Sequence, residues 1–160
     1  MFPYANTAAA ARLGLEDVAN DPSILKDVTL SMSYANTDRN SAKAAESFLE
    51  EINSPGSSPP TIGVVGERVS RVCASLTDIV SWYKVPLVSY GCTTQNLSNK
   101  TNLFFLRGTP SDEYQARVIR DLLVRFSFTT VATIYSSDEF GTSIQTVRRV
   151  SSSYLVLYSL

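Results

Sequence analysis

Two hydrophobic periods alternate along the chain. Apolar residues recur every three to four positions over 6–19 and 41–52, which predicts amphipathic helices, whereas residues 28–34 alternate strictly between apolar and polar side chains, which predicts a strand. Further helices are predicted around 72–83, 111–126 and 140–150, and further strands over 61–65, 85–90, 104–107, 130–135 and 154–160. Alternating strands and helices predict a doubly wound α/β domain with a mainly parallel sheet and helices on both faces.

For the helix over 111–126, the pattern also predicts the N-cap residue and the buried face. Ser111 is suited to the N-cap position that precedes the first helical turn. The residues predicted to be buried on one face of this helix are Tyr114, Val118, Ile119, Leu122, Leu123 and Phe126.

Composition then excludes several classes of function. The 160 residues carry 14 basic and 15 acidic side chains and no histidine. The nearly neutral balance disfavours nucleic acid as a partner. The absence of imidazole removes Ser-His-Asp and Cys-His catalysis and most zinc sites, and no glycine-rich phosphate loop occurs. We therefore expect no enzyme, no cofactor and no metal.

Cys73 and Cys92 are the two cysteines. The first lies in the first turn of a predicted helix and the second in the loop after the neighbouring strand, so we expect the two side chains to lie close together. Proximity leaves open whether they form a disulfide, because a bridge also needs suitably aimed Cβ atoms.

Candidate chemistry lies just after the strands, because ligands of open parallel sheets bind at the carboxyl ends of the strands. The candidate ligand-binding residues on these loops are Ser70, Gly91, Cys92, Thr93, Asp112 and Phe140. Hydroxyls and helix-start amides suit a carboxylate, while a carboxylate and an aromatic face suit an ammonium. The predicted ligand is therefore a small zwitterion.

Structural roles also fit these residues. Ser70 and Ser111 suit helix caps, and Asp112 suits the first turn of a helix, where a negative charge complements the dipole. Phe140 also fits a hydrophobic core. The sequence leaves both readings open.

Longer segments resemble a known family. Four segments resemble the receptor family ligand-binding region over about residues 8–145: LGLEDVANDPSILKDVTLSMSYANTDRNSAKAAESFLE, VPLVSYGCTTQNLSNKT, FFLRGTPSDEYQARVIRDLL and VATIYSSDEFG. This is the type I periplasmic-binding-protein fold of class C G-protein-coupled receptors, natriuretic peptide receptors and ionotropic glutamate receptor amino-terminal domains. The sequence of these segments is most similar to that of the class C receptors, of GABA-B and metabotropic glutamate type. These receptors bind amino acids or related molecules between two lobes.

The resemblance assigns roles by position. It implies that Ser70 meets the ligand carboxylate, that Thr93 supplies a hydroxyl, that Asp112 lies near the ligand amine and that Phe140 covers the ligand. The family often has Gly-Pro-x-Cys-Ser-Ser before the ligand serine, and this chain instead places the charged Arg71 at the mouth of the expected site.

The same resemblance predicts the organisation of the whole. Residues 1–150 are expected to form lobe one without its first strand, and 151–160 an atypical tail leading towards a missing second lobe and membrane region. We expect the full-length protein to be a membrane receptor that places this region on the extracellular side of the plasma membrane. The chain itself shows no signal peptide or membrane segment. A receptor dimer is compatible with the family. The alternatives are a soluble periplasmic-type solute-binding protein and a flavodoxin-like enzyme or response regulator.

The chain also contains two adjacent acceptor tripeptides for N-glycosylation, which are relevant only if the protein is exported. They are Asn96-Leu97-Ser98 and Asn99-Lys100-Thr101.

Overall fold

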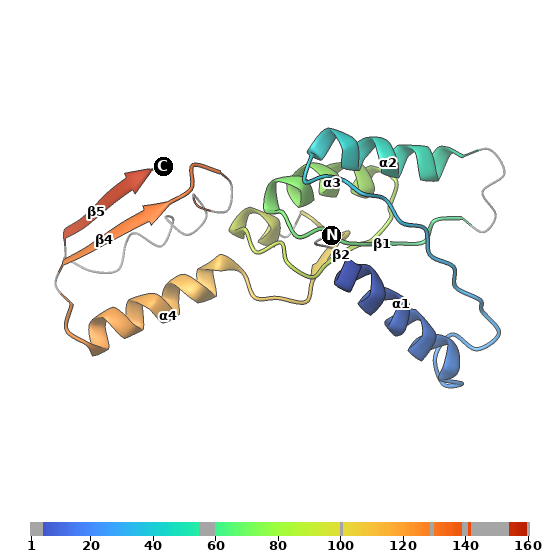
Figure 1. The fold of residues 1–160 in the computed structure, drawn as a ribbon, viewed down its shortest axis with the longest axis horizontal. Coiled ribbons are helices and arrows are strands. Elements are labelled where there is room, and N and C mark those ends of the chain that lie inside the picture. The colour runs from blue at the N-terminus through green and yellow to red at the C-terminus, as the bar shows by residue number, and fades with distance from the viewer. Residues whose placement is uncertain are drawn as a thin grey trace. The chain divides into compact units, whose positions relative to one another are not determined.

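A computed structural model describes residues 5–54, 60–99, 101–128, 130–138, 141 and 154–159 (Figure 1). The chain divides into two compact units, with the boundary between Asn36 and Thr37.

The first unit contains helix α1 (Ala5–Asn20), as the sequence predicts. The strand predicted over 28–34 is wrong, because these residues are irregular and Val28 and Tyr34 are 55% and 54% exposed. A strand persists only where its backbone groups pair with a neighbour. The described part of this unit offers no such neighbour.

A parallel three-stranded sheet organises the second unit (Figure 1). Its strands β1 (Val64–Val65), β2 (Leu87–Ser89) and β3 (Phe105–Arg107) lie in sequence order. Val64 pairs with Leu87, which pairs in turn with Phe105. The predicted α/β class and parallel sheet are confirmed, and the strands are shorter than their apolar runs.

Helices α2 (Ser41–Asn53) and α3 (Ser70–Trp82) supply the residues that pack on one face of this sheet. The buried core cluster consists of Phe48, Cys73, Leu76, Val80, Val85, Leu87, Cys92, Leu97 and Phe105. Because strand side chains alternate between faces, the register partners Val65, Val88 and Leu106 lie on the opposite face. They are 67%, 39% and 57% exposed.

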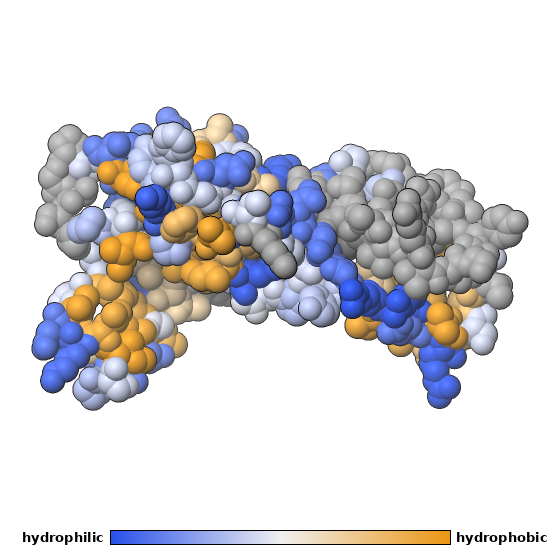
Figure 2. All heavy atoms as spheres, turned by 180° about the vertical axis from the view of Figure 1, so that it is seen from behind, coloured by the Kyte–Doolittle hydropathy of each residue, from blue (hydrophilic) through white to orange (hydrophobic). Residues whose placement is uncertain are grey.

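Helix α4 (Asp112–Arg125) begins directly after Ser111, as predicted, although the Ser111 side chain makes no capping hydrogen bond. The prediction that its apolar side chains are buried is wrong. Tyr114, Val118 and Leu122 are all more than half exposed, and Figure 2 shows hydrophobic surface over α4. An amphipathic helix buries its apolar stripe only against a partner, and the described residues provide none for this stripe.

A second, two-stranded parallel sheet pairs β4 (Thr130–Tyr135) with β5 (Tyr154–Ser159). Both strands were predicted. Apart from Gly141, the helix predicted over 140–150 lies outside the described residues, as does the boundary predicted at residue 150. Among the helices that the structure describes, none is long and apolar enough to cross a membrane.

Candidate functional site

The candidate site lies at the carboxyl ends of β1, β2 and β3. The loop after β1 leads into α3, whose first residue is the buried Ser70. Val69 holds the N-cap position, so Ser70 does not have the capping role that its sequence position allowed. Its hydroxyl therefore belongs to the first helical turn, where unpaired backbone N–H groups favour an anion.

Ser89 joins the loop after β1 to the loop after β2. The Ser89 hydroxyl donates to the Glu67 carbonyl at 2.6 Å and accepts from the backbone N–H groups of Gly91 and Cys92 at 3.1 and 2.9 Å. One fully buried hydroxyl thus fixes two of the predicted ligand loops against each other.

Gly91 allows these loops to approach closely. A Cβ atom at this position would lie 2.7 Å from Arg68 Cγ and 3.3 Å from Arg68 Cα, which is too close for any side chain. Glycine at this position therefore leaves room for the backbone and the first side-chain carbons of Arg68.

Cys73 and Cys92 form a disulfide with a Cα–Cα distance of 6.4 Å. The predicted proximity of the two side chains is confirmed, and the question of a bridge that the sequence left open is answered. The bridge joins α3, which begins at Ser70, to the loop after β2, which contains Thr93.

The loops after β2 and β3 also meet. The Asp112 N–H donates to the Thr93 carbonyl at 2.8 Å, and the Gly108 N–H donates to the Ser89 carbonyl at 3.0 Å. These bonds bring Thr93 beside Asp112 at the sheet edge where the strand-end argument placed both loops.

Several buried oxygen atoms at this junction have no hydrogen-bond partner among the described residues. They are Thr93 Oγ1, Thr94 Oγ1, Thr109 Oγ1 and both carboxylate oxygens of Asp112. Asp112 is fully buried. A buried polar atom without a partner costs about 1–3 kcal/mol, and a carboxylate costs more, so a water, ion or ligand that pairs with these atoms would stabilise the junction.

Arg107, at the end of β3, braces the same junction. Its guanidinium donates to the Thr94 carbonyl at 3.0 Å, to the Cys92 carbonyl at 3.4 Å and to the Ser98 hydroxyl. Burial lowers the pKa of Arg107 and the nearby Asp112 carboxylate raises it, so that the net pKa lies below its ordinary value. The guanidinium remains charged at neutral pH.

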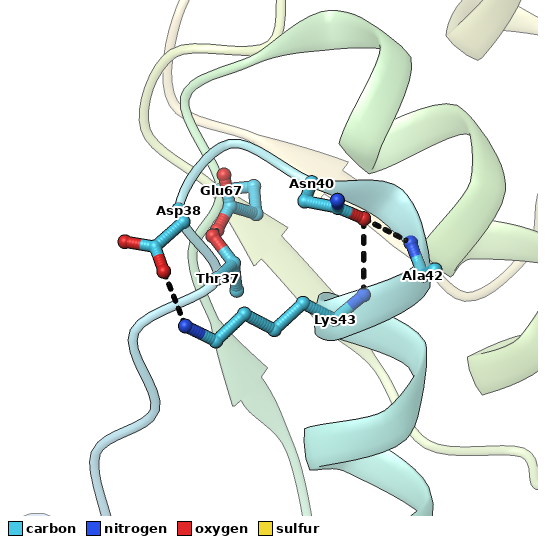
Figure 3. Close-up of polar contacts among 6 residues, drawn as sticks. All are labelled: Thr37, Asp38, Asn40, Ala42, Lys43 and Glu67. Carbon is cyan, nitrogen blue, oxygen red and sulfur yellow. Dashed lines mark hydrogen bonds and ion pairs between the residues drawn. The ribbon is translucent and has the colours of Figure 1, made fainter.

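The loop that precedes α2 is tied to the loop that precedes α3 (Figure 3). The Thr37 hydroxyl donates to Glu67 Oε1 at 2.5 Å, and Arg71 Nη2 donates to the Arg39 carbonyl at 3.0 Å. Figure 3 also shows Asn40 Oδ1 accepting hydrogen bonds from the backbone N–H groups of Ala42 and Lys43 in the first turn of α2. Arg71, predicted at the mouth of the site, therefore also holds the preceding loop.

The predicted site residues thus fall into two groups. The structure brings Ser70, Gly91, Cys92, Thr93 and Asp112 to one sheet edge, whereas Phe140 lies outside the described residues. Sequence reasoning missed Ser89 and Arg107. The signal was available, because each is a polar residue at the end of a short apolar strand.

Comparisons with known proteins show which family the chain resembles. Residues 6–148 match the family described as the receptor family ligand binding region. The human extracellular calcium-sensing receptor is 30% identical over 142 residues, covering 79% of this chain and 13% of the receptor. Glutamate receptor 3.7 of Arabidopsis thaliana is 34% identical over 140 residues, covering 82% and 14%.

Metabotropic glutamate receptor 4 of Rattus norvegicus is 29% identical over 153 residues, covering 84% of this chain and 17% of the receptor. The chain thus spans about a seventh of the length of these relatives. They are receptors and not enzymes, as the sequence predicts, and they confirm its resemblance to the class C receptors. The matched residues include every described loop of the candidate site, and this chain belongs to the receptor family ligand binding region, whose fold is of the periplasmic-binding-protein type.

Proposed function

We propose that this chain is lobe one of an extracellular receptor region that binds an amino acid or a similar small molecule in a cleft between two lobes. Binding in that cleft triggers signalling across the membrane, in the manner of a G-protein-coupled receptor. Membership of the family supports the ligand-binding role. The names of two relatives, which include the word glutamate, favour an amino acid.

One observation carries the proposal for the site. The Asp112 N–H is bonded to the Thr93 carbonyl, while the side-chain oxygens of both residues have no partner within the described part of the chain. The backbone bond fixes the two residues together, and the unpaired oxygens match the hydrogen-bonding groups of a zwitterion. A site built only for stability would pair these atoms internally.

Each residue has a distinct role in this proposal. Ser70 and the first N–H groups of α3 bind the ligand carboxylate, which the positive end of the helix dipole also attracts. The half-buried Thr93 donates to or accepts from the ligand. Asp112 is covered from solvent, so we assign it the negative charge behind Thr93 that favours the ammonium.

Two further residues complete the site. Gly91 lets the backbone of its loop, including Cys92, approach the ligand closely, and the family resemblance assigns to Phe140 the aromatic ring that covers the ammonium. A second lobe would exclude water from the exposed side of the ligand and strengthen these bonds.

Saturation-transfer difference NMR tests the proposal, because this method detects the weak binding expected of a single lobe. The chain is mixed in turn with the standard L-amino acids, and we expect transfer to at least one of them. Ser70→Ala and Thr93→Val should each weaken the binding by about 1.5–3 kcal/mol, which is roughly 10- to 150-fold.

Ser75→Ala is the matched control, because the exposed Ser75 hydroxyl lies one turn further along α3 and bonds to the Arg71 carbonyl. This variant should bind as the original chain does. Unchanged binding in both site variants, or equal loss in the control, would contradict the assigned roles.

A further inference from the structure

The two adjacent N-glycosylation tripeptides lie in different local structures. Asn96, Leu97 and Ser98 belong to the 3-10 helix η1 (Gln95–Ser98). Leu97 is 5% exposed and packs in the core cluster, and the Ser98 hydroxyl accepts a hydrogen bond from Arg107. The first tripeptide is therefore anchored by both residues that follow its asparagine.

The second tripeptide begins where η1 ends. Asn99 and Thr101 are both exposed, and Asn99 Oδ1 accepts the Thr101 N–H at 3.2 Å. This is an Asx turn, a local structure that needs no distant contact. The turn engages Oδ1 and leaves Nδ2, the nitrogen that glycosylation modifies, outside this hydrogen bond.

We propose that Asn99, and not Asn96, is an N-glycosylation site of this protein. The inference rests on the proposed extracellular role, because only an exported chain meets the transferase and its lipid-linked donor. In the reaction, Asn99 Nδ2 attacks C1 of an oligosaccharide carried on a lipid pyrophosphate. The new N–C1 bond forms as the C1–O bond breaks, the amide proton passes to a base, and the lipid pyrophosphate leaves.

Folding selects between the two asparagines. Reaching an acceptor site from Asn96 would require Leu97 to leave the core and Ser98 to leave Arg107, whereas the Asn99 turn requires neither change. Both asparagines also line the same surface hollow, together with Gln95 and Ser98. Two branched glycans three positions apart would compete for that space.

The test is expression of the chain behind an added signal sequence in eukaryotic cells, followed by digestion of the secreted protein with peptide N-glycosidase. We expect one glycan, seen as a single shift in gel mobility. Asn99→Gln and Thr101→Ala should abolish the shift, while the matched controls Asn96→Gln and Ser98→Ala should retain it. A shift that survives Asn99→Gln, a shift lost in Asn96→Gln, or no shift in the original chain would overturn the proposal.

This experiment separates the inference from the proposed function. The added signal sequence delivers the chain to the transferase whether or not the protein is a receptor, so the result reports on the acceptor site alone. Digestion of the natural protein from its own cells, with mass spectrometry of the Asn99 peptide, tests export. Modification in the first experiment but not in the second would leave the choice of Asn99 standing and contradict the extracellular role.

Discussion

Replacement of Arg107 by methionine should destabilise the site more than any change of an exposed arginine. The substitution keeps an unbranched apolar stem of similar length and removes the guanidinium that holds the Thr94 and Cys92 carbonyls. It also removes the cation that lies near the buried Asp112 carboxylate.

The magnitude follows from these contacts. A hydrogen bond from a charged donor contributes about 1.5–3 kcal/mol to the free energy of unfolding. The 3.0 Å bond to the Thr94 carbonyl should contribute an amount in this range, whereas the 3.4 Å bond to the Cys92 carbonyl is weak. Leaving Asp112 without its cation adds a further cost, smaller than the 3–5 kcal/mol of a broken direct buried pair. We expect a loss of about 2–4 kcal/mol in the free energy of unfolding, or roughly 5–15 °C in Tm.

Urea unfolding followed by circular dichroism measures this loss. Arg107→Lys should lose less, about 1–2 kcal/mol, because one ammonium keeps the charge but does not span the same acceptors. The double variant Arg107→Met/Asp112→Asn should lose less than the sum of its single changes. Arg117→Met is the control, since the contacts of Arg117 are a surface ion pair with Glu113 and a cation–π contact with the exposed Tyr114 ring.

Two results would refute this reasoning. One is an Arg107→Met protein within about 0.5 kcal/mol of the original chain, the range typical of surface substitutions. The other is strict additivity in the double variant, which would mean that the charges of Arg107 and Asp112 do not interact.

Three further predictions concern stability and titration. Changing Cys73 and Cys92 to alanine should cost about 3 kcal/mol, because the bridge closes a loop with a sequence separation of 19; an equal urea midpoint with and without reductant would contradict this. Thr37→Val, compared with Thr37→Ser, should speed amide exchange in the loop before α3 through loss of a bond of about 1 kcal/mol, and equal exchange would exclude that bond. The Ser136 hydroxyl and then the Gly141 N–H hold the pKa of Asp138 below its ordinary 3.8, so the stability that this carboxylate contributes is present above that pH and is lost as the pH falls through the lower folded pKa. NMR titration of Ser136→Ala should show a higher Asp138 pKa than in the original chain.

Local pattern alone was sufficient for much of the fold. The helices at α1, α2, α3 and α4 were placed from periodicity, because each repeats apolar residues at helical spacing over several turns. The strand ends also identified loops that meet in the structure, since parallel strands direct their carboxyl ends to one edge. The placement of Thr93 and Asp112 at that edge, and the proximity of Cys73 and Cys92, follow from topology.

Burial was not predictable from the same pattern. The apolar stripe of α4 and the alternating residues 28–34 have the right spacing for a core, yet Val118 and Tyr34 are more than half exposed. Spacing shows which side chains share a face, whereas burial also requires a second surface opposite that face. That surface depends on distant parts of the chain.

The polar framework of the site was likewise a matter of tertiary structure. Ser89 and Arg107 act through backbone carbonyls and N–H groups of other loops, and such partners have no residue-specific signal in a sequence. The disulfide needed a Cα separation that only the packing of α3 against β2 sets. The sequence by itself determined which loops share the sheet edge and which chemistry they carry, and the tertiary structure decided how hydrogen bonds and a covalent bridge hold them there, because those bonds join residues far apart in the chain.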